Sequence, residues 1–452
     1  MKSYYQLVRH SGNQDLFRAV EMAVSALKHG VPFHLHAEGL RGTGKTSIFR
    51  AAKDILPHIE RIKGCIYNCE PSYPHCPHHS HLTSEQIKEI GSELIPCPFL
   101  EISHAAKVGT VVGSIDLGKL TNRLNPVAAV LPGTVPQAHR GIIFIDEINR
   151  LADTSPEIAD VLLAVMGTKP GRVQIEESGL PVVEIPVSVT IWAASNPDEE
   201  PGCLTQVRRQ LADRFDMVIP MGRPNEYKAI SEILSDKKPT PVLRNESVLS
   251  GLTFTEIQSG EQIRSTLANI YVDFGLESIR AIEAIETGAR LNAMLAGRAT
   301  VQTADLISVV PFALGHRTDS GSITSILKYL ETLDKSLITN TPNNNFEISQ
   351  VPALPSEGEL SGTESLLKRM WRQFKSVFKS TSPKKQHNMA ENKQSPSPEP
   401  QKSNGSMRGG PQSSPADPLK TDIISPAKVA APLITMKIEN YVSDDGDHIH
   451  GR

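Results

Sequence analysis

The sequence alternates between short apolar runs and stretches of helical spacing from residue 1 to about residue 318. Short apolar runs bounded by turn residues are typical of buried strands, whereas apolar residues three and four positions apart indicate helices. The pattern predicts strands at Phe33–Ala37, Phe99–Ile102, Gly141–Glu147, Val187–Ala194 and Met217–Pro220, and helices at Ser47–Leu56, Pro156–Met166 and Glu277–Leu295. We therefore expect an α/β domain over residues 1–222 and a helical domain over residues 223–318.

This pattern ends after residue 318. Residues 319–362 predict a linker, which becomes rich in Asn, Pro, Ser and Glu, and residues 380–452 combine many prolines and serines with one aromatic residue. Such a composition cannot bury enough apolar surface to offset the entropy of ordering, so 380–452 is expected to be a disordered tail. Residues 363–379 between them predict a basic amphipathic helix, which either folds back or docks on a partner or a membrane surface.

The overall charge is close to neutral. The 452 residues include 47 Lys and Arg against 50 Asp and Glu, a net charge of -3, so nucleic-acid binding would need a local basic patch. No apolar stretch is long enough to predict a transmembrane helix, and the amino terminus lacks the apolar core of a signal peptide. We expect a cytoplasmic protein.

A phosphate-binding loop follows the first predicted strand. Residues 39–46 match the pattern G-x-x-x-x-G-K-[ST] between a predicted strand and a predicted helix. Its glycines let backbone N–H groups surround the phosphates, its lysine interacts with the β- and γ-phosphates, and its last hydroxyl can bind Mg²⁺. The predicted residues for ATP and Mg²⁺ are Gly39, Leu40, Arg41, Gly42, Thr43, Gly44, Lys45 and Thr46.

Further candidates follow the later strands. Asp146 and Glu147 end a buried apolar run, so a parallel strand would deliver both carboxylates to the carboxyl edge of the sheet. Asp146 is predicted to hold Mg²⁺, and Glu147 to activate the attacking water as general base. Asn196 ends the next apolar run and could hydrogen-bond that water or the γ-phosphate. Arg214 and Arg280 are candidates for stabilising the charge of phosphoryl transfer.

In this order the motifs resemble the Walker A, Walker B, sensor 1, arginine finger and sensor 2 of an AAA+ ATPase. More specific resemblances to the ATPase subunit of magnesium chelatase are carried by Asp146–Asn149, Ala194–Pro197, Leu211–Phe215 and Ser278–Arg280. The resemblance covers residues 10–318. It implies an AAA+ parallel sheet with flanking helices, a β-hairpin insertion around Val173–Ile185 and an all-α lid. Ala106–Val108 stands where the family has Glu-Asp-Arg, so a divergent homologue is expected.

The same resemblance implies a mode of action. It implies a ring, commonly a hexamer, with ATP at the subunit interfaces, where Arg214 reaches the nucleotide of the neighbouring subunit and Arg280 can also act across the interface. The implied activity is ATP hydrolysis that drives metal insertion or activation of a partner. That partner carries an integrin-like metal-binding domain. Because no such domain follows residue 318, a separate subunit is expected to supply it.

Four of the five cysteines fall in one segment, an insertion at residues 64–97 that also contains several histidines. Clustered thiols in a reducing compartment favour a metal over disulfides, and together with imidazoles they can bind zinc or an iron–sulfur cluster. The spacing matches neither a C-x2-C zinc finger nor a ferredoxin run, and reduced thiols in a loop are the alternative. The expected ligands of a structural or redox-sensing metal are Cys65, Cys69, Cys76 and Cys97.

The sequence leaves three other functions open. A MoxR-like chaperone ATPase that matures a metalloenzyme would use the same catalytic residues. A nucleic-acid motor would line its pore with the hairpin at Val173–Ile185, but the acidic balance of that hairpin argues against contact with phosphates. A nucleotide-dependent scaffold would retain its function after Glu147→Gln, whereas a motor would not.

Overall fold

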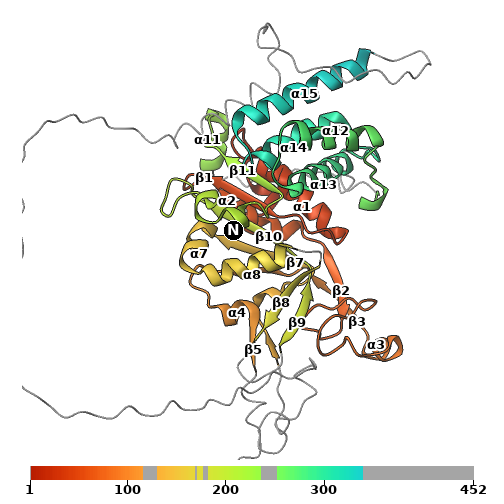
Figure 1. Ribbon diagram of the computed structural model, residues 1–452. Helices are drawn as coiled ribbons and strands as arrows, with labels where there is room; N and C mark the ends of the chain where they lie inside the picture. Colours follow the sequence, from red (N-terminus) through yellow and green to blue (C-terminus); the bar gives the residue numbers. More distant parts are fainter. Residues whose placement is uncertain (1, 116–129, 168–169, 177–181, 236–251, 340–452) are drawn as a thin grey trace, which may run out of the picture.

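The computed structural model describes residues 2–115, 130–167, 170–176, 182–235 and 252–339 (Figure 1). The predicted amphipathic helix at 363–379, the predicted tail and the second half of the predicted linker lie outside these ranges. Within the described ranges, no helix is long and apolar enough to cross a bilayer.

A five-stranded parallel sheet forms the centre of the first domain. Its strands lie in the spatial order β11, β1, β10, β7, β4. Their bounds are Leu35–Gly39 for β1, Phe99–Ile102 for β4, Gly141–Asp146 for β7, Val189–Ser195 for β10 and Met217–Met221 for β11. All five predicted strands are present, which confirms the α/β prediction.

The register of the sheet aligns the carboxyl ends of three strands. Glu38 at the end of β1 lies opposite Ser195 of β10, and Ala194 of β10 lies opposite Asp146 of β7. In an open parallel sheet the loops at the carboxyl ends of the strands form the ligand-binding crevice. The P-loop, Asn196 and the acidic end of β7 therefore meet at one edge.

Helices cover both faces of the sheet, and β7 shows why. Ile142 and Phe144 pack with Trp192 in one buried cluster, whereas the alternate residues Ile143 and Ile145 belong to a second cluster on the other face. The main flanking helices are α1 (Gln14–Lys28), α2 (Lys45–Ala51), α7 (Ile148–Thr154) and α8 (Pro156–Gly167). The shorter helices before the lid are η1 (Tyr4–Gln6), η2 (Ala52–Ile55), α4 (Val108–Val112), α6 (Thr134–Gln137), α9 (Leu204–Val207), α10 (Arg209–Ala212) and α11 (Tyr227–Leu234).

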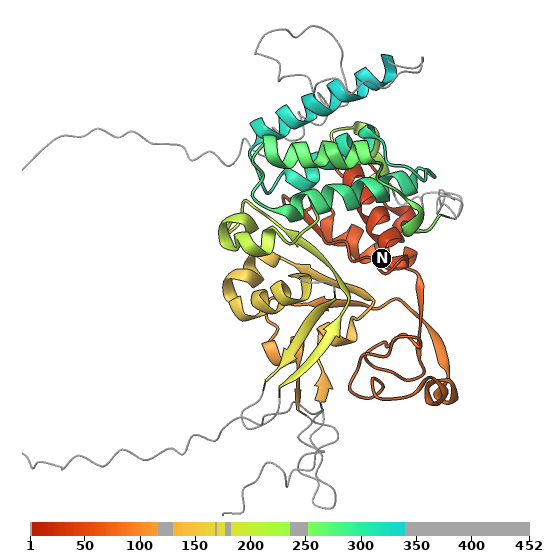
Figure 2. The same ribbon diagram turned by 45° about the vertical axis from the view of Figure 1, so that its right-hand side comes forward.

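Three antiparallel strand pairs extend from this core. The expected hairpin insertion is formed by β8 (Gly171–Ile175) and β9 (Val183–Val187), with Val173 opposite Ile185. A second pair, β5 (Gly113–Ile115) and β6 (Val130–Pro132), lies beside it in Figure 2. The third pair, β2 (His58–Ile62) and β3 (Ser92–Pro96), carries the cysteine-rich insertion and its helix α3 (Ser84–Ile90).

A helical lid follows the core at the end opposite the hairpins (Figures 1 and 2). It contains η4 (Phe254–Glu256), α12 (Glu261–Asp273), α13 (Ile279–Leu295), α14 (Thr303–Leu314) and α15 (Ser320–Thr339). The prediction of a linker from residue 319 is wrong over its first part, because α15 packs against α14 through buried residues. These residues recur at helical spacing as Ile323, Ile326, Leu327 and Leu330.

Candidate functional site

The P-loop connects β1 to α2 through a turn that requires glycine. Gly42 has a φ of 74° and Gly44 a φ of 88°, values at which a side chain would be strained. Lys45 begins α2 and is only 9% exposed. The motif glycines thus bring Lys45 and Thr46 directly beside the carboxyl end of β1.

Lys45 is held by the loop itself. Its Nζ donates to the carbonyl oxygens of Gly39 at 2.5 Å and Leu40 at 2.8 Å. Burial lowers the pKa of Lys45, and the nearby charge of Asp146 opposes that shift. A partly desolvated ammonium at this place interacts strongly with an anion, because little water screens it.

Thr46 and Asp146 meet across the sheet edge. The Thr46 Oγ1 donates to Asp146 Oδ2 at 3.0 Å, although the two residues are 100 positions apart in the sequence. A hydroxyl and a carboxylate are oxygen donors of the kind that Mg²⁺ prefers at nucleotide sites. The pair therefore fits Mg²⁺, and these two residues would hold the ion that accompanies ATP.

Glu147 occupies a left-handed turn between β7 and α7. Its φ and ψ are 53° and 48°, a conformation uncommon for a residue with a side chain and one that is enriched at functional sites. Its Oε2 accepts from Arg150 Nη1 at 2.9 Å, and its side chain is 41% exposed. The predicted general base is therefore accessible and lies one residue from the predicted Mg²⁺ ligand.

Asn196 sits in a polar network at the end of β10. Its Nδ2 donates to Glu199, and Glu199 also forms an ion pair with Arg41 of the P-loop. Arg41 holds the pKa of Glu199 below its ordinary value. Asn149 braces this turn by donating to the carbonyls of Asn196 at 3.3 Å and Gly202 at 2.8 Å. Glu199 is not among the residues predicted from the sequence, although it lies only three positions after Asn196.

Arg214 lies apart from the P-loop of its own chain. Its Nη1 is buried and has no hydrogen-bond partner among the described residues, and it approaches the end of α8 at Gly167. Burial lowers the pKa of Arg214, and the charge of Arg280 adds to this effect. Within the described ranges Arg214 makes no hydrogen bond or ion pair with residues 39–46.

Asp213 joins the core to the lid, a role that the sequence analysis did not assign. Its Oδ1 accepts from Arg317 Nε at 3.0 Å, and its Oδ2 accepts from Ser278 Oγ at 3.1 Å. Arg280 Nη1 lies 3.7 Å from the same Oδ2, so Arg280 contacts the residue before Arg214. Arg317 also donates to the Phe215 carbonyl at 2.9 Å. The two predicted arginines are thereby brought close together at the junction of core and lid.

Two buried ionisable groups on β1 support this edge. His36 Nε2 lies 2.8 Å from Ser195 Oγ, and burial lowers the pKa of His36 to about 3, which keeps the ring neutral. Glu38 follows two residues later, 19% exposed, and burial raises its pKa to about 7. Neither residue was singled out from the sequence, because polar residues in a predicted strand normally face solvent.

The cysteine cluster is only partly as predicted. Cys65, Cys69 and Cys76 come together with His79, whereas Cys97 does not join them. The Cys97 Sγ instead faces the backbone carbonyls of Pro98 at 3.7 Å and Arg140 at 3.5 Å. The expectation that Cys97 is a ligand is therefore wrong, because β3 and the start of β4 carry it away from the loop that holds the other three.

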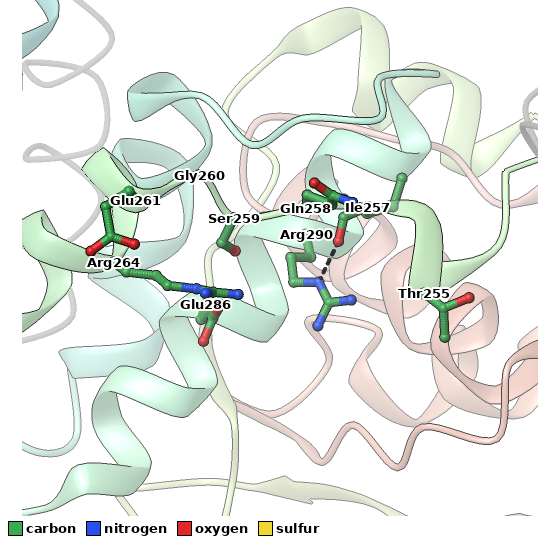
Figure 3. Close-up of a pocket in the computed structure, with 9 residues that line it drawn as sticks. All are labelled: Thr255, Ile257, Gln258, Ser259, Gly260, Glu261, Arg264, Glu286 and Arg290. Carbon is green, nitrogen blue, oxygen red and sulfur yellow. Dashed lines mark hydrogen bonds between the residues drawn. The ribbon is translucent and has the colours of Figure 1, made fainter.

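A cavity of about 480 Å³ lies in the lid (Figure 3). Arg290 lines it, yet this side chain is bound to the carbonyl oxygens of Ile257 at 3.0 Å and Phe254 at 2.7 Å. None of the lining residues belongs to the P-loop, β7 or the turn after β10. Arg290 thus stabilises the first segment of the lid through these two hydrogen bonds. It does not belong to the candidate nucleotide site.

Comparison with known proteins gives related sequences over about two thirds of this chain. A family model, the AAA lid domain, matches residues 264–325. The magnesium-chelatase 38 kDa subunit of Acidiphilium rubrum is 28% identical over 298 residues, which cover 62% of this chain and 82% of the relative. The subunit ChlI of Nephroselmis olivacea is 27% identical over 310 residues, covering 64% and 82%. The 38 kDa subunit of Cereibacter sphaeroides is 26% identical over 347 residues, covering 72% and 97%.

Solved structures give partial likenesses. A chain from a cryo-EM-based structure of the complex between the magnesium-chelatase subunits BchI and BchD matches with a TM-score of 0.38 and 22% identity, over 72% of this chain and 99% of that one. A putative ATPase from Cytophaga hutchinsonii matches with a TM-score of 0.44 and 14% identity, over 75% and 92%. The assignment therefore rests on the related sequences, the lid match and the order of the motifs. This chain is a divergent homologue of the magnesium-chelatase ATPase subunits, within the AAA+ ATPases.

Proposed function

We propose that the chain is an ATP-hydrolysing motor that forms a ring of its own copies and remodels a partner protein, as a magnesium-chelatase-type ATPase. The observation that carries the proposal is the contact of Thr46 with Asp146 at 3.0 Å, beside Lys45 and Glu147. It unites a P-loop hydroxyl with a carboxylate from a distant strand, which is the donor pair needed for ATP with Mg²⁺.

Each residue has a distinct task in the proposed reaction, in which ATP and water give ADP and phosphate. Lys45 would neutralise charge on the β- and γ-phosphates, while Thr46 and Asp146 would hold the Mg²⁺ that offsets the remaining phosphate charge. Glu147 takes a proton from the water that attacks the γ-phosphorus, and Asn196 positions this water or the γ-phosphate.

Arg214 is proposed to act on the nucleotide of the neighbouring subunit, in a ring that is commonly hexameric in the family. Support comes from its buried, unpartnered Nη1 and from its lack of contact with its own P-loop in the described part of the chain. A buried cationic N–H without an acceptor is costly, so an anion supplied by a neighbour would stabilise it. Arg280, close to the same Asp213, would assist at or across that interface.

The proposed target of the motor is a separate protein subunit, because the relatives are themselves named as subunits of magnesium chelatase. Metal insertion and activation of a metalloenzyme, the MoxR-like alternative, share every residue of this site. A nucleic-acid motor is less well supported. Arg172 of the hairpin lies 3.2 Å from Glu184, so its positive charge is already paired.

A pair of substitutions separates a motor from a nucleotide-dependent scaffold. Glu147→Gln should bind ATP normally but lower turnover by about 10²–10⁴-fold, because the general base is lost, and it should accumulate ATP-bound oligomers. Lys45→Ala should abolish ATP binding. Phosphate release and nucleotide binding measure both effects.

Glu157→Gln is the matched control, since Glu157 is an exposed carboxylate at the start of α8, outside the site. It should hydrolyse ATP like the unmodified protein. Full turnover by Glu147→Gln would contradict the assignment of the base and favour the scaffold.

A further inference from the structure

A cluster of thiol and imidazole groups lies in the insertion between β2 and α3. The donor atoms of Cys65, Cys69, Cys76 and His79 all lie within 4.8 Å of one another. In a tetrahedral zinc site with Zn–S bonds of about 2.3 Å, neighbouring sulfurs are about 3.8 Å apart. The Sγ atoms of Cys65 and Cys76 are 4.0 Å apart, and Cys76 Sγ lies 3.1 Å from His79 Nδ1. The four groups are thus spaced like the ligands of one tetrahedral ion.

The backbone around the sulfurs favours thiolates. The Cys69 N–H donates to Cys65 Sγ at 3.5 Å, and the N–H groups of His75 and Cys76 each donate to Cys69 Sγ at 3.3 Å. Such donors stabilise a negatively charged sulfur, which is the form that binds metals.

Two tight turns supply the ligands in pairs. Asn68 N–H donates to the Cys65 carbonyl at 3.2 Å, which closes the turn between Cys65 and Cys69. His79 N–H donates to the Cys76 carbonyl at 3.1 Å, which closes the turn between Cys76 and His79. Two facing turns of this kind bring four ligands together without a helix or strand.

The loop that carries the four donors has no regular secondary structure to stabilise it. Residues 63–83 contain no helix or strand, only the isolated bridge between Glu70 and Tyr73. Apart from Tyr67 and Asn68, the buried residues of this segment are the three cysteines. Tyr67 and the three cysteines pack at the second hydrophobic cluster, and a long segment without secondary structure is typically stabilised in addition by a disulfide or a metal. The five cysteines form no disulfide in this structure, which favours a metal.

We propose that Cys65, Cys69, Cys76 and His79 bind one zinc ion. One ion can contact all four donors, whereas an iron–sulfur cluster would place several atoms between its ligands. Zinc accepts mixed thiolate and imidazole ligands in a closed tetrahedral site, and the three cysteines are buried, so the site is structural.

The zinc would fix the insertion to the core. Asn68, within the first ligand turn, donates through Nδ2 to the Gln137 carbonyl of α6 at 2.7 Å. His75 stacks on His139 with ring centroids 3.8 Å apart, so it closes the cluster on its core side. His75 is not one of the four ligands, although its Nδ1 lies 3.3 Å from Cys69 Sγ, because it does not reach all the other donors.

The test is the metal content of the full chain, purified through a tag without histidines and without added metal or chelator. We expect about one zinc per chain by elemental analysis. Cys69→Ser and His79→Ala should lose most of this zinc. The matched controls Cys97→Ser and His81→Ala should retain it, since Cys97 faces backbone carbonyls and His81 is exposed and outside the cluster.

Zinc below about 0.2 equivalents, or about one equivalent of iron in its place, would overturn the proposal. So would equal zinc in His79→Ala and His81→Ala. Where Cys69→Ser does not fold, the unmodified full chain loaded with Co²⁺ decides. Intense tetrahedral absorption with a thiolate-to-cobalt band supports the site, and the weak absorption of six-coordinate Co²⁺ contradicts it. None of these outcomes depends on ATP hydrolysis, so the zinc site and the proposed motor are tested independently of each other.

Discussion

The sheet edge and the cysteine loop both gather polar groups, but they do so in opposite ways. At the sheet edge, Thr46 and Asp146 are 100 residues apart and are brought together by parallel strands in register. In the insertion, Cys65 to His79 lie in one short segment, and two turns bring them together. The first arrangement is built by the parallel sheet, whereas the second is a loop without helix or strand whose buried residues pack at the second hydrophobic cluster.

The two sites also differ in whether one chain supplies all of their residues. The four donors of the cysteine loop belong to one chain, so the proposed zinc site needs no neighbour. The nucleotide edge has its P-loop, carboxylates and Asn196, but Arg214 makes no contact with residues 39–46 in the described part of its own chain. The proposed shared active site and the proposed self-contained metal site predict different responses to mixing and to mutation.

Mixing of subunits gives the largest expected effect. Arg214→Ala should lower ATP turnover by about 10³–10⁵-fold, because the charge of the transferred phosphoryl group loses its cation. Lys45→Ala should also be inactive. Mixed together, the two variants should regain part of the activity, since a Lys45→Ala subunit can supply Arg214 to the intact P-loop of its neighbour. Phosphate release at a series of mixing ratios measures this.

Two results would contradict this difference between the sheet edge and the cysteine loop. Absence of any recovery at all ratios would mean that Arg214 acts within its own chain. Loss of zinc in Arg214→Ala would mean that the two regions are coupled. The matched control is Arg209→Ala, because Arg209 is 72% exposed and forms a surface ion pair with Glu277. It should leave turnover unchanged.

The junction of core and lid gives the next largest effect. Asp213→Ala removes the carboxylate partner of Arg317, whose side chain is only 6% exposed. Leaving this charge without its carboxylate should lower the free energy of unfolding by about 3 kcal/mol. Urea denaturation measures the change.

Arg280→Ala removes the other arginine that faces the Asp213 carboxylate. Arg280 is 41% exposed and lies 3.7 Å from Asp213, so its loss should cost under about 1 kcal/mol. Equal destabilisation by both variants would contradict the central role of Arg317. Unchanged zinc in both would confirm that the insertion does not depend on the lid.

The smallest effect concerns the pH response of the sheet edge. Burial raises the pKa of Glu38 to about 7, from an ordinary value of 4.5. Between these values the folded chain holds a proton that the unfolded chain has released, so Glu38 lowers stability as pH rises from about 4.5 to about 7. Glu38→Gln should remove this contribution, at most about 3 kcal/mol.

Denaturation of both proteins across this pH range measures the difference. The stability gained by Glu38→Gln should grow between the two pKa values and become constant above them. A difference that does not change with pH would mean that Glu38 titrates normally, and that the edge of β1 is more hydrated than its burial indicates.

Local sequence patterns are sufficient to predict the candidate nucleotide site and most of the core. The P-loop, the Asp146–Glu147 pair and the five strands follow from local patterns, because a buried parallel strand is a continuous apolar run and the phosphate loop needs its glycines in order. The helix α15 is also encoded, in the spacing of Ile323 to Leu330, although the sequence analysis predicts a linker there.

Only the tertiary structure decided which distant side chains meet. Cys97 precedes a strand and is carried away from the other cysteines, while His79, one of several neighbouring histidines, is turned toward them. Asp213 pairs with Arg317, 104 residues later, and Glu199 pairs with Arg41, 158 residues earlier. These pairings depend on strand register and on lid packing, which act over long sequence separations. Local sequence patterns show which residue types can bind or pair, whereas the packing of distant segments determines which of them come into contact.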